Sequence, residues 1–274
     1  MERSTLQETA ARGGFLWATG IEDTFITEPH PRTGRTLDEY ELTGHYRQWP
    51  EDLGLMGSLG VRAARYGLPW HRINPGSGQW DSASADGPLE KMLELGIDPI
   101  VDLVHYGVPS WIENAFAHPD YPERAAEYAG RIAERYKGRI RCYTPLNEPR
   151  ITAWYCGRLG WWPPYGHGMT GFARVLAAVC RGMVRATQAI RAADPDASIV
   201  HVDATDLYTP ATPDLAAAAA VRQEIVFLAM DLILGRVGLD HPLRGFCEKH
   251  GLADELLRWF ADNAIRIYVC DINL

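Results

Sequence analysis

Lysine is scarce in this chain, since only three of its 27 basic residues are Lys and the others are Arg. The 35 Asp and Glu residues outnumber the basic ones, and the formal net charge of −8 has the wrong sign for a nucleic-acid-binding protein. A run of about 18 apolar residues is also missing, so we expect no membrane-spanning helix. Residues 1–14 are polar and charged and lack the apolar core of an export signal, which favours a cytoplasmic protein.

Patterns that hold metals, disulfides or nucleotides are missing as well. The five cysteines are scattered and never spaced as Cys-x-x-Cys, so we expect reduced thiols. The nine histidines show no spacing typical of a zinc or iron site. A dinucleotide-binding sheet would need a glycine-rich turn after its first strand, and Gly20-Ile21-Glu22-Asp23 is no such turn. We therefore expect neither a metal nor a cofactor.

Strands and helices are predicted to alternate along the chain. Short apolar runs rich in β-branched and aromatic residues predict strands at 15–19, 61–66, 99–104, 140–144, 198–202 and 267–272. One-sided apolar spacing predicts a helix over 123–137, and two more are expected from an N-cap at Thr170 to about 193 and from Thr212-Pro213 to about 234. This alternation indicates an α/β fold with a parallel sheet, in one domain over residues 1–274. Six strands fit either a doubly wound sheet or a barrel.

Polar and aromatic residues follow several of the predicted strands. His105, Tyr106 and Trp111 come after the third strand, and Asn147 and Glu148 come after the fourth. Parallel α/β folds place their ligand-binding groups at the carboxyl ends of the strands. Hydrogen-bonding side chains mixed with Trp and Tyr suit a sugar, because its hydroxyls need polar partners and its C–H face packs on aromatic rings.

Several motifs, in order along the chain, resemble glycoside hydrolase family 1, a family of β-glycosidases. Asn147-Glu148-Pro149 resembles the family's acid/base motif, and His105-Tyr106 lies where the family has His-Trp. The stretches 45–53, 65–66 and 70–73 look like the segments around its second strand, and Asn273 falls where an Asn-Tyr-Tyr would begin. The resemblance covers nearly all of the chain and implies a TIM-type (β/α) barrel.

The resemblance also implies roles for individual residues. Glu148 would be the general acid/base, which protonates the leaving oxygen and then activates water. Asn147 would hold the 2-hydroxyl of the sugar, His105 would hold a hydroxyl further round the ring, and Arg65 would neutralise the nucleophilic carboxylate. Tyr106, Trp111 and Asn273 would complete the substrate-binding set.

Three departures from the family bear on catalysis. A family-1 barrel has eight strands and its nucleophile is a Glu in a Thr-Glu-Asn-Gly type motif after the seventh, whereas this chain ends after its sixth predicted strand and has no such motif. The family's Gln-Ile-Glu is here Gly20-Ile21-Glu22, and residues 81–86 are small and polar where the family has aromatics. Asp271 is a candidate for a substitute carboxylate, although a paired or solvated Asp at a strand end is the commoner case. We therefore expect an incomplete barrel with about six of eight βα units.

Three functions remain open at this point. The first is a glycoside hydrolase of β-glucosidase type that cleaves O-glycosidic bonds of a small-molecule glycoside with Glu148, and whose activity depends on a nucleophile not evident here. The second is a non-catalytic sugar-binding pseudoenzyme, and the third is a truncated or engineered barrel. Six strands cannot close a barrel, so its open edges predict self-association into a homo-oligomer.

Overall fold

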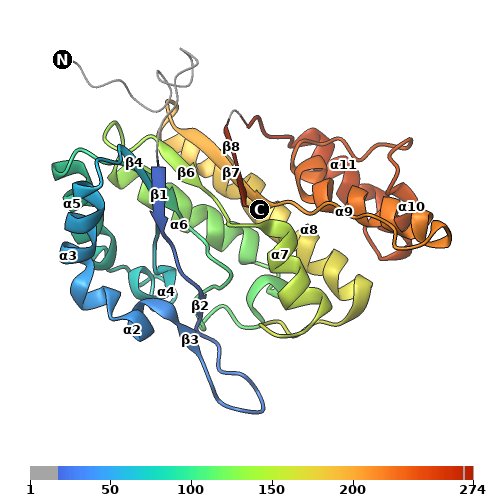
Figure 1. Ribbon diagram of the computed structural model, residues 1–274, viewed down its shortest axis with the longest axis horizontal. Coiled ribbons are helices and arrows are strands. Elements are labelled where there is room, and N and C mark those ends of the chain that lie inside the picture. Colours follow the sequence, from blue (N-terminus) through green and yellow to red (C-terminus); the bar gives the residue numbers. More distant parts are fainter. Residues whose placement is uncertain (1–17, 268, 274) are drawn as a thin grey trace.

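The computed structural model describes residues 18–267 and 269–273, and a parallel sheet of six strands forms its centre (Figure 1). The strands lie side by side in the order in which they occur along the chain. They are β1 (Ala18–Ile21), β4 (Ala63–Gly67), β5 (Asp98–Asp102), β6 (Cys142–Thr144), β7 (Ser198–Ala204) and β8 (Val269–Asn273). A doubly wound sheet would reverse its strand order at a switch point, and this sheet does not. The expected incomplete (β/α) barrel of six strands is therefore confirmed.

Helices cover the outer face of the sheet. The helices are α2 (Glu39–Thr43), α3 (His45–Ser58), α4 (Trp70–Ile73), α5 (Ala83–Glu94), α6 (Tyr121–Arg135), α7 (Pro149–Ala153), α8 (Gly168–Ala193), α9 (Ala216–Ile233), α10 (Arg244–Lys249) and α11 (Asp254–Asp262). Two 3₁₀ turns, η1 (Ala115–Ala117) and η3 (Pro213–Leu215), and a π-helical turn, η2 (Trp154–Arg158), join them. Within the described residues, no helix is both long and apolar enough to span a membrane.

The strands alternate between two buried faces, as the period of two in a strand requires. Val101, Tyr143 and Ile199 pack in the large core between the sheet and the helices. Their neighbours Cys142 and Val200, together with Val202, form a separate small cluster, against which the half-buried Ile100 packs. These two clusters therefore mark the helix-covered outer face and the inner face of the barrel wall.

The predicted elements agree with the structure except at their ends. All six predicted strands are present within a few residues, although 15–17 and 268 lie outside the described part. The helix predicted over 123–137 is α6, and the other two are α8 and the pair η3–α9. The predicted N-cap at Thr170 is wrong, because α8 begins at Gly168 with His167 as its N-cap. The Thr170 hydroxyl instead lies 3.1 Å from Nδ1 of His250.

A short hairpin that the sequence pattern did not predict lies against the segment that follows β5. It consists of β2 (Phe25–Ile26) and β3 (Leu37–Asp38), whose strands of two residues are too short to show alternation. The Thr27 hydroxyl donates to the carbonyl oxygen of Val108 at 2.9 Å. A Cβ on Gly107 would lie only 1.8 Å from the carbonyl oxygen of Phe25. Gly107 is therefore needed for the hairpin to approach the segment that carries His105 and Tyr106.

Candidate active site

Asn147 and Glu148 are held at the carboxyl end of the sheet by main-chain hydrogen bonds to the segment that follows β5 and to β7. The Asn147 N–H donates to the carbonyl oxygen of Val104 at 2.9 Å, and the Glu148 N–H donates to that of Val202 at 3.1 Å. Glu148 is 7% exposed and adopts a left-handed conformation, with φ 44° and ψ 70°, just before α7. A side chain in this region is strained by about 1–3 kcal/mol, and such strain is concentrated at functional sites.

The Tyr106 hydroxyl contacts the carboxylate of Glu148 directly, donating a short hydrogen bond to Oε2. Burial, followed by the negative charge of Glu148, raises the pKa of Tyr106 well above its ordinary value. The hydroxyl therefore keeps its proton and serves as a donor. The Tyr106 ring also contacts Trp162, with their centroids 5.3 Å apart, so the loop at 161–165 reaches this part of the site.

Asn147 and Arg65 form a buried hydrogen-bonded pair across the inner face. Nη1 of Arg65 donates to Oδ1 of Asn147 at 2.8 Å, which turns the Asn147 amide nitrogen toward Nε2 of His105, 3.4 Å away. Since this nitrogen can only donate, Nε2 of His105 is assigned as the acceptor. The opposite ring nitrogen, Nδ1, then carries the proton and donates it to Asp102 Oδ2 at 2.7 Å. One chain of hydrogen bonds thus orients all of these side chains.

Glu22 is a member of this network that sequence reasoning missed as a site residue. Both Nε and Nη2 of Arg65 donate to Glu22 Oε1, at 3.1 and 2.6 Å. Burial raises the pKa of Glu22, and the Arg65 charge offsets this only in part. Its second oxygen, Oε2, is buried and has no hydrogen-bond partner among the described residues. The Gly-Ile-Glu sequence marked a departure from a family motif, but nothing in it indicated that Glu22 binds Arg65.

The remaining predicted site residues lie apart from this network or outside the described part. The Trp111 indole N–H donates to the carbonyl oxygen of Asn74 at 2.8 Å, and Arg124 lies over its ring. Asn273 pairs in register with Ala204, and Asp271 with Val202, but the side chains of both lie outside the described residues. The proposed roles of Trp111, Asn273 and Asp271 thus stay predictions.

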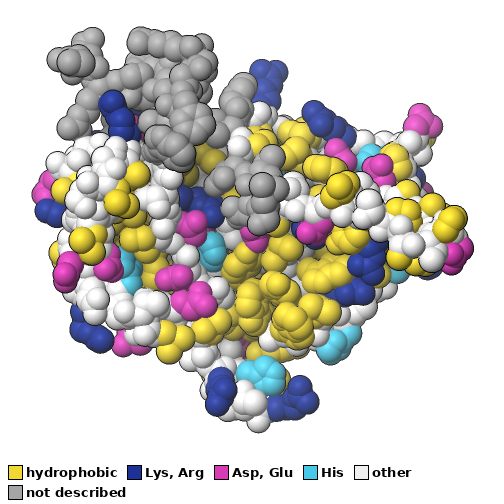
Figure 2. All heavy atoms as spheres, in the orientation of Figure 1, with side chains coloured by type: hydrophobic (Ala, Val, Ile, Leu, Met, Phe, Trp, Pro, Cys, Tyr) yellow, Lys and Arg dark blue, Asp and Glu magenta, His cyan; other side chains and the backbone are white. Residues whose placement is uncertain are grey.

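The inner face presents charged groups that belong to hydrogen-bond networks. Figure 2 shows basic, acidic and histidine side chains close together between β1 and the hydrophobic surface near α7. In the part of the chain that the structure describes, no group of three or more His, Cys, Asp or Glu side chains could hold a metal ion. The arrangement offers a carboxyl group, an amide and an imidazole on one buried edge, which suits proton transfer and the binding of hydroxyl groups.

Comparison with known proteins gives the same family as the motifs. The model of glycosyl hydrolase family 1 matches residues 16–234. The chain is 35% identical over 148 residues to thermostable beta-glucosidase B of Thermobispora bispora, which covers 52% of this chain and 31% of that protein. It is 28% identical over 174 residues to beta-glucosidase A of Thermotoga maritima, covering 61% of this chain and 39% of that one.

Solved structures agree with the fold. The AHE enzyme of Alicyclobacillus herbarius matches with a TM-score of 0.73 and 27% identity, over 83% of this chain and 54% of that one. The family 1 β-glucosidase of Thermotoga maritima matches with a TM-score of 0.81 and 22% identity, over 94% of this chain and 64% of that one. The chain therefore spans less than two thirds of the length of each of these relatives.

Proposed function

Because the chain belongs to glycosyl hydrolase family 1, we propose that it carries the acid/base part of a β-glucosidase-type site that cleaves O-glycosidic bonds. The observation that supports this most is the position of Glu148. It is held in a strained conformation at the end of the sheet, hydrogen bonded to Tyr106 and next in sequence to the Asn147–Arg65 pair.

In the proposed reaction the Glu148 carboxyl group protonates the oxygen of the departing group and afterwards takes a proton from water. Tyr106 fixes the plane of this carboxyl through its bond to Oε2. Asn147 and His105 bind hydroxyls of the sugar, and their orientation is set before the ligand arrives by Arg65 and Asp102. A small-molecule glycoside is thus the proposed substrate.

Hydrolysis by this chemistry also needs a second carboxylate. Arg65, proposed by resemblance to neutralise the nucleophile, binds the carboxylate of Glu22 from the segment that follows β1. This pairing favours a second candidate function, a protein that binds the sugar through Asn147 and His105 without cleaving it.

Turnover of a panel of aryl β-glycosides by the 274-residue chain and by Glu148→Gln tests the proposal. We expect the variant to lose activity by about 100-fold or more while it retains affinity for glucose, measured by calorimetry. If neither protein cleaves the aryl β-glycosides but both bind glucose, the sugar-binding function holds. Glycosidase activity that survives in Glu148→Gln, or a folded chain that neither cleaves nor binds, overturns the proposal.

Location and assembly are proposed on separate grounds. The cysteines Cys142, Cys156, Cys180, Cys247 and Cys270 are all free thiols, which supports a reducing, cytoplasmic location.

β1 and β8 lie at opposite edges of the sheet and do not pair with each other in the described residues, which supports self-association through sheet edges. Analytical ultracentrifugation tests this, since a monomer at every concentration contradicts it.

A further inference from the structure

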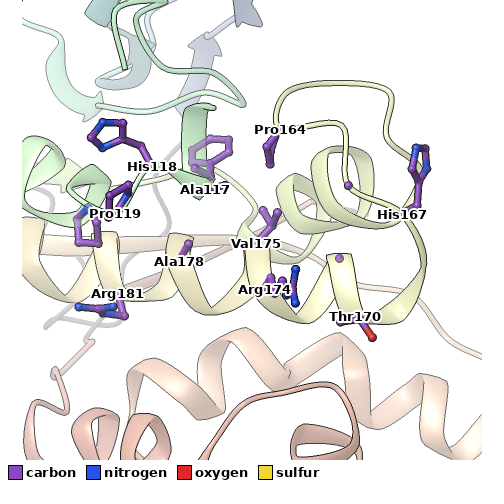
Figure 3. A pocket seen from close by; sticks show the side chains of 14 residues that line it. Ala117, His118, Pro119, Pro164, His167, Thr170, Arg174, Val175, Ala178 and Arg181 are labelled. Atoms are coloured by element: carbon purple, nitrogen blue, oxygen red, sulfur yellow. The ribbon is translucent and has the colours of Figure 1, made fainter. Parts of the chain in front are cut away.

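A cavity lies on the outside of the barrel, away from Glu148. Its volume is about 590 Å³, within the usual range for small-molecule sites, and it opens between η1, the start of α6 and the first half of α8. None of the residues of the candidate active site lines it. Figure 3 shows His118 and His167 above α8 at opposite ends of the cavity, and Arg174 and Arg181 projecting from α8 itself.

The charges around this cavity have one sign. Its titratable lining residues are His118, His167, Arg174 and Arg181, and no Asp or Glu is among the described residues that line it. This contrasts with the net charge of −8 for the whole chain. Within the described residues, no carboxylate pairs with Arg174, and Arg181 lies over the ring of Trp259, 5.4 Å from its centroid. Their guanidinium donors are thus not neutralised by an acidic partner.

The floor and wall of the cavity are preformed. Gly171, Arg174, Val175, Ala178 and Arg181 recur at helical spacing, so they share one face of α8. The two arginines are seven residues apart, which separates their Cα atoms by about 10 Å along the helix. Small side chains between them leave room for a ligand to lie along α8.

Close packing of glycines holds the opposite wall in place. A Cβ on Gly171 would lie 2.1 Å from the carbonyl oxygen of Gly157, and one on Gly166 would lie 2.8 Å from the same oxygen. The loop that carries Pro164 and His167 is therefore fixed against the start of α8. Pro119 and Pro164, which are exposed and half-buried, add an apolar surface beside the arginines.

We propose that this cavity binds a small organic phosphate of the size of a sugar phosphate. Arginine is suited to phosphate because its planar group donates two parallel hydrogen bonds to it. The apolar wall would contact the carbon skeleton, so an organic phosphate is favoured over the inorganic ion. The proposal does not depend on glycoside hydrolysis, since the cavity shares no residue with the site at Glu148.

Isothermal titration of the full chain with glucose 6-phosphate, inorganic phosphate and glucose tests the proposal. We expect saturable binding of glucose 6-phosphate, weaker binding of inorganic phosphate, and a marked loss of both at high salt. Arg174→Gln should weaken the binding of glucose 6-phosphate about tenfold, and the double variant Arg174→Gln/Arg181→Gln about 100-fold.

Two controls separate this site from the active site and from general charge effects. Arg236→Gln removes the same charge from an exposed position outside the cavity and should leave the affinity unchanged. Glu148→Gln should also leave it unchanged. Since glucose is expected to bind at the Glu148 site, its affinity should not change in the double variant. Undiminished binding of glucose 6-phosphate by the folded double variant, or its loss in Glu148→Gln, overturns the proposal.

Discussion

Replacement of Gly107 by Ala should separate the hairpin β2–β3 from the site. The new Cβ would lie 1.8 Å from the carbonyl oxygen of Phe25, whereas a carbon and an oxygen in contact need about 3.3 Å. The hairpin must therefore move by about 1.5 Å. This shift breaks the hydrogen bond from Thr27 to Val108 and the weaker one from the Phe25 N–H to His105, which have lengths of 2.9 and 3.5 Å.

The expected loss of stability follows from these contacts. Each hydrogen bond contributes about 0.5–1.5 kcal/mol net, and overpacking costs about 1–3 kcal/mol. We expect Gly107→Ala to lower the free energy of unfolding by about 2–4 kcal/mol in urea titrations followed by tryptophan fluorescence. Glucose affinity should fall as well, because the hairpin contacts the segment that carries His105.

Gly54→Ala is the matched control. Gly54 lies inside α3 with nothing within 4 Å of an added Cβ, so the same change should stabilise the protein by up to about 1 kcal/mol. A loss below about 0.5 kcal/mol for Gly107→Ala would refute the reasoning, since it would mean that the hairpin does not depend on this close approach.

Three further predictions concern the network at the end of the sheet. Glu148→Gly should be more stable to urea than Glu148→Ala by about 1 kcal/mol, because only glycine adopts the left-handed conformation without strain; equal stabilities would contradict this. Burial raises the pKa of Glu22 above 4.5, so its stabilising effect is present below that pH and is lost as the pH rises through the raised pKa. Glu22→Gln should therefore gain stability relative to the parent chain as the pH rises through this raised pKa in urea titrations, and a constant difference would argue against the burial effect. Asn147→Ala should destabilise the fold by about 1–3 kcal/mol in the same assay, because it removes the hydrogen bonds that Arg65 and His105 make to the buried amide, and an unchanged midpoint would show that water replaces the amide.

Much of the architecture could be predicted from local patterns. Apolar runs located the six strands to within a few residues, and one-sided spacing located α6, because burial on one face leaves a periodic trace in the sequence. The grouping of His105, Asn147 and Glu148 could also be predicted, since the carboxyl ends of parallel strands meet at one edge. The first residue of a helix was harder to place, since the N-cap of α8 was predicted at Thr170 and is His167.

Other features were decided only by the tertiary structure. A count of six strands could not distinguish a barrel from a doubly wound sheet, and the spatial order of the strands did. Glu22 and Arg65 are 43 residues apart, and their pairing depends on the register between β1 and β4. The cavity of about 590 Å³ likewise exists only where η1, α6 and α8 pack together. Sequence periodicity reports whether a side chain is buried, but which partner it meets is decided by how separate elements pack.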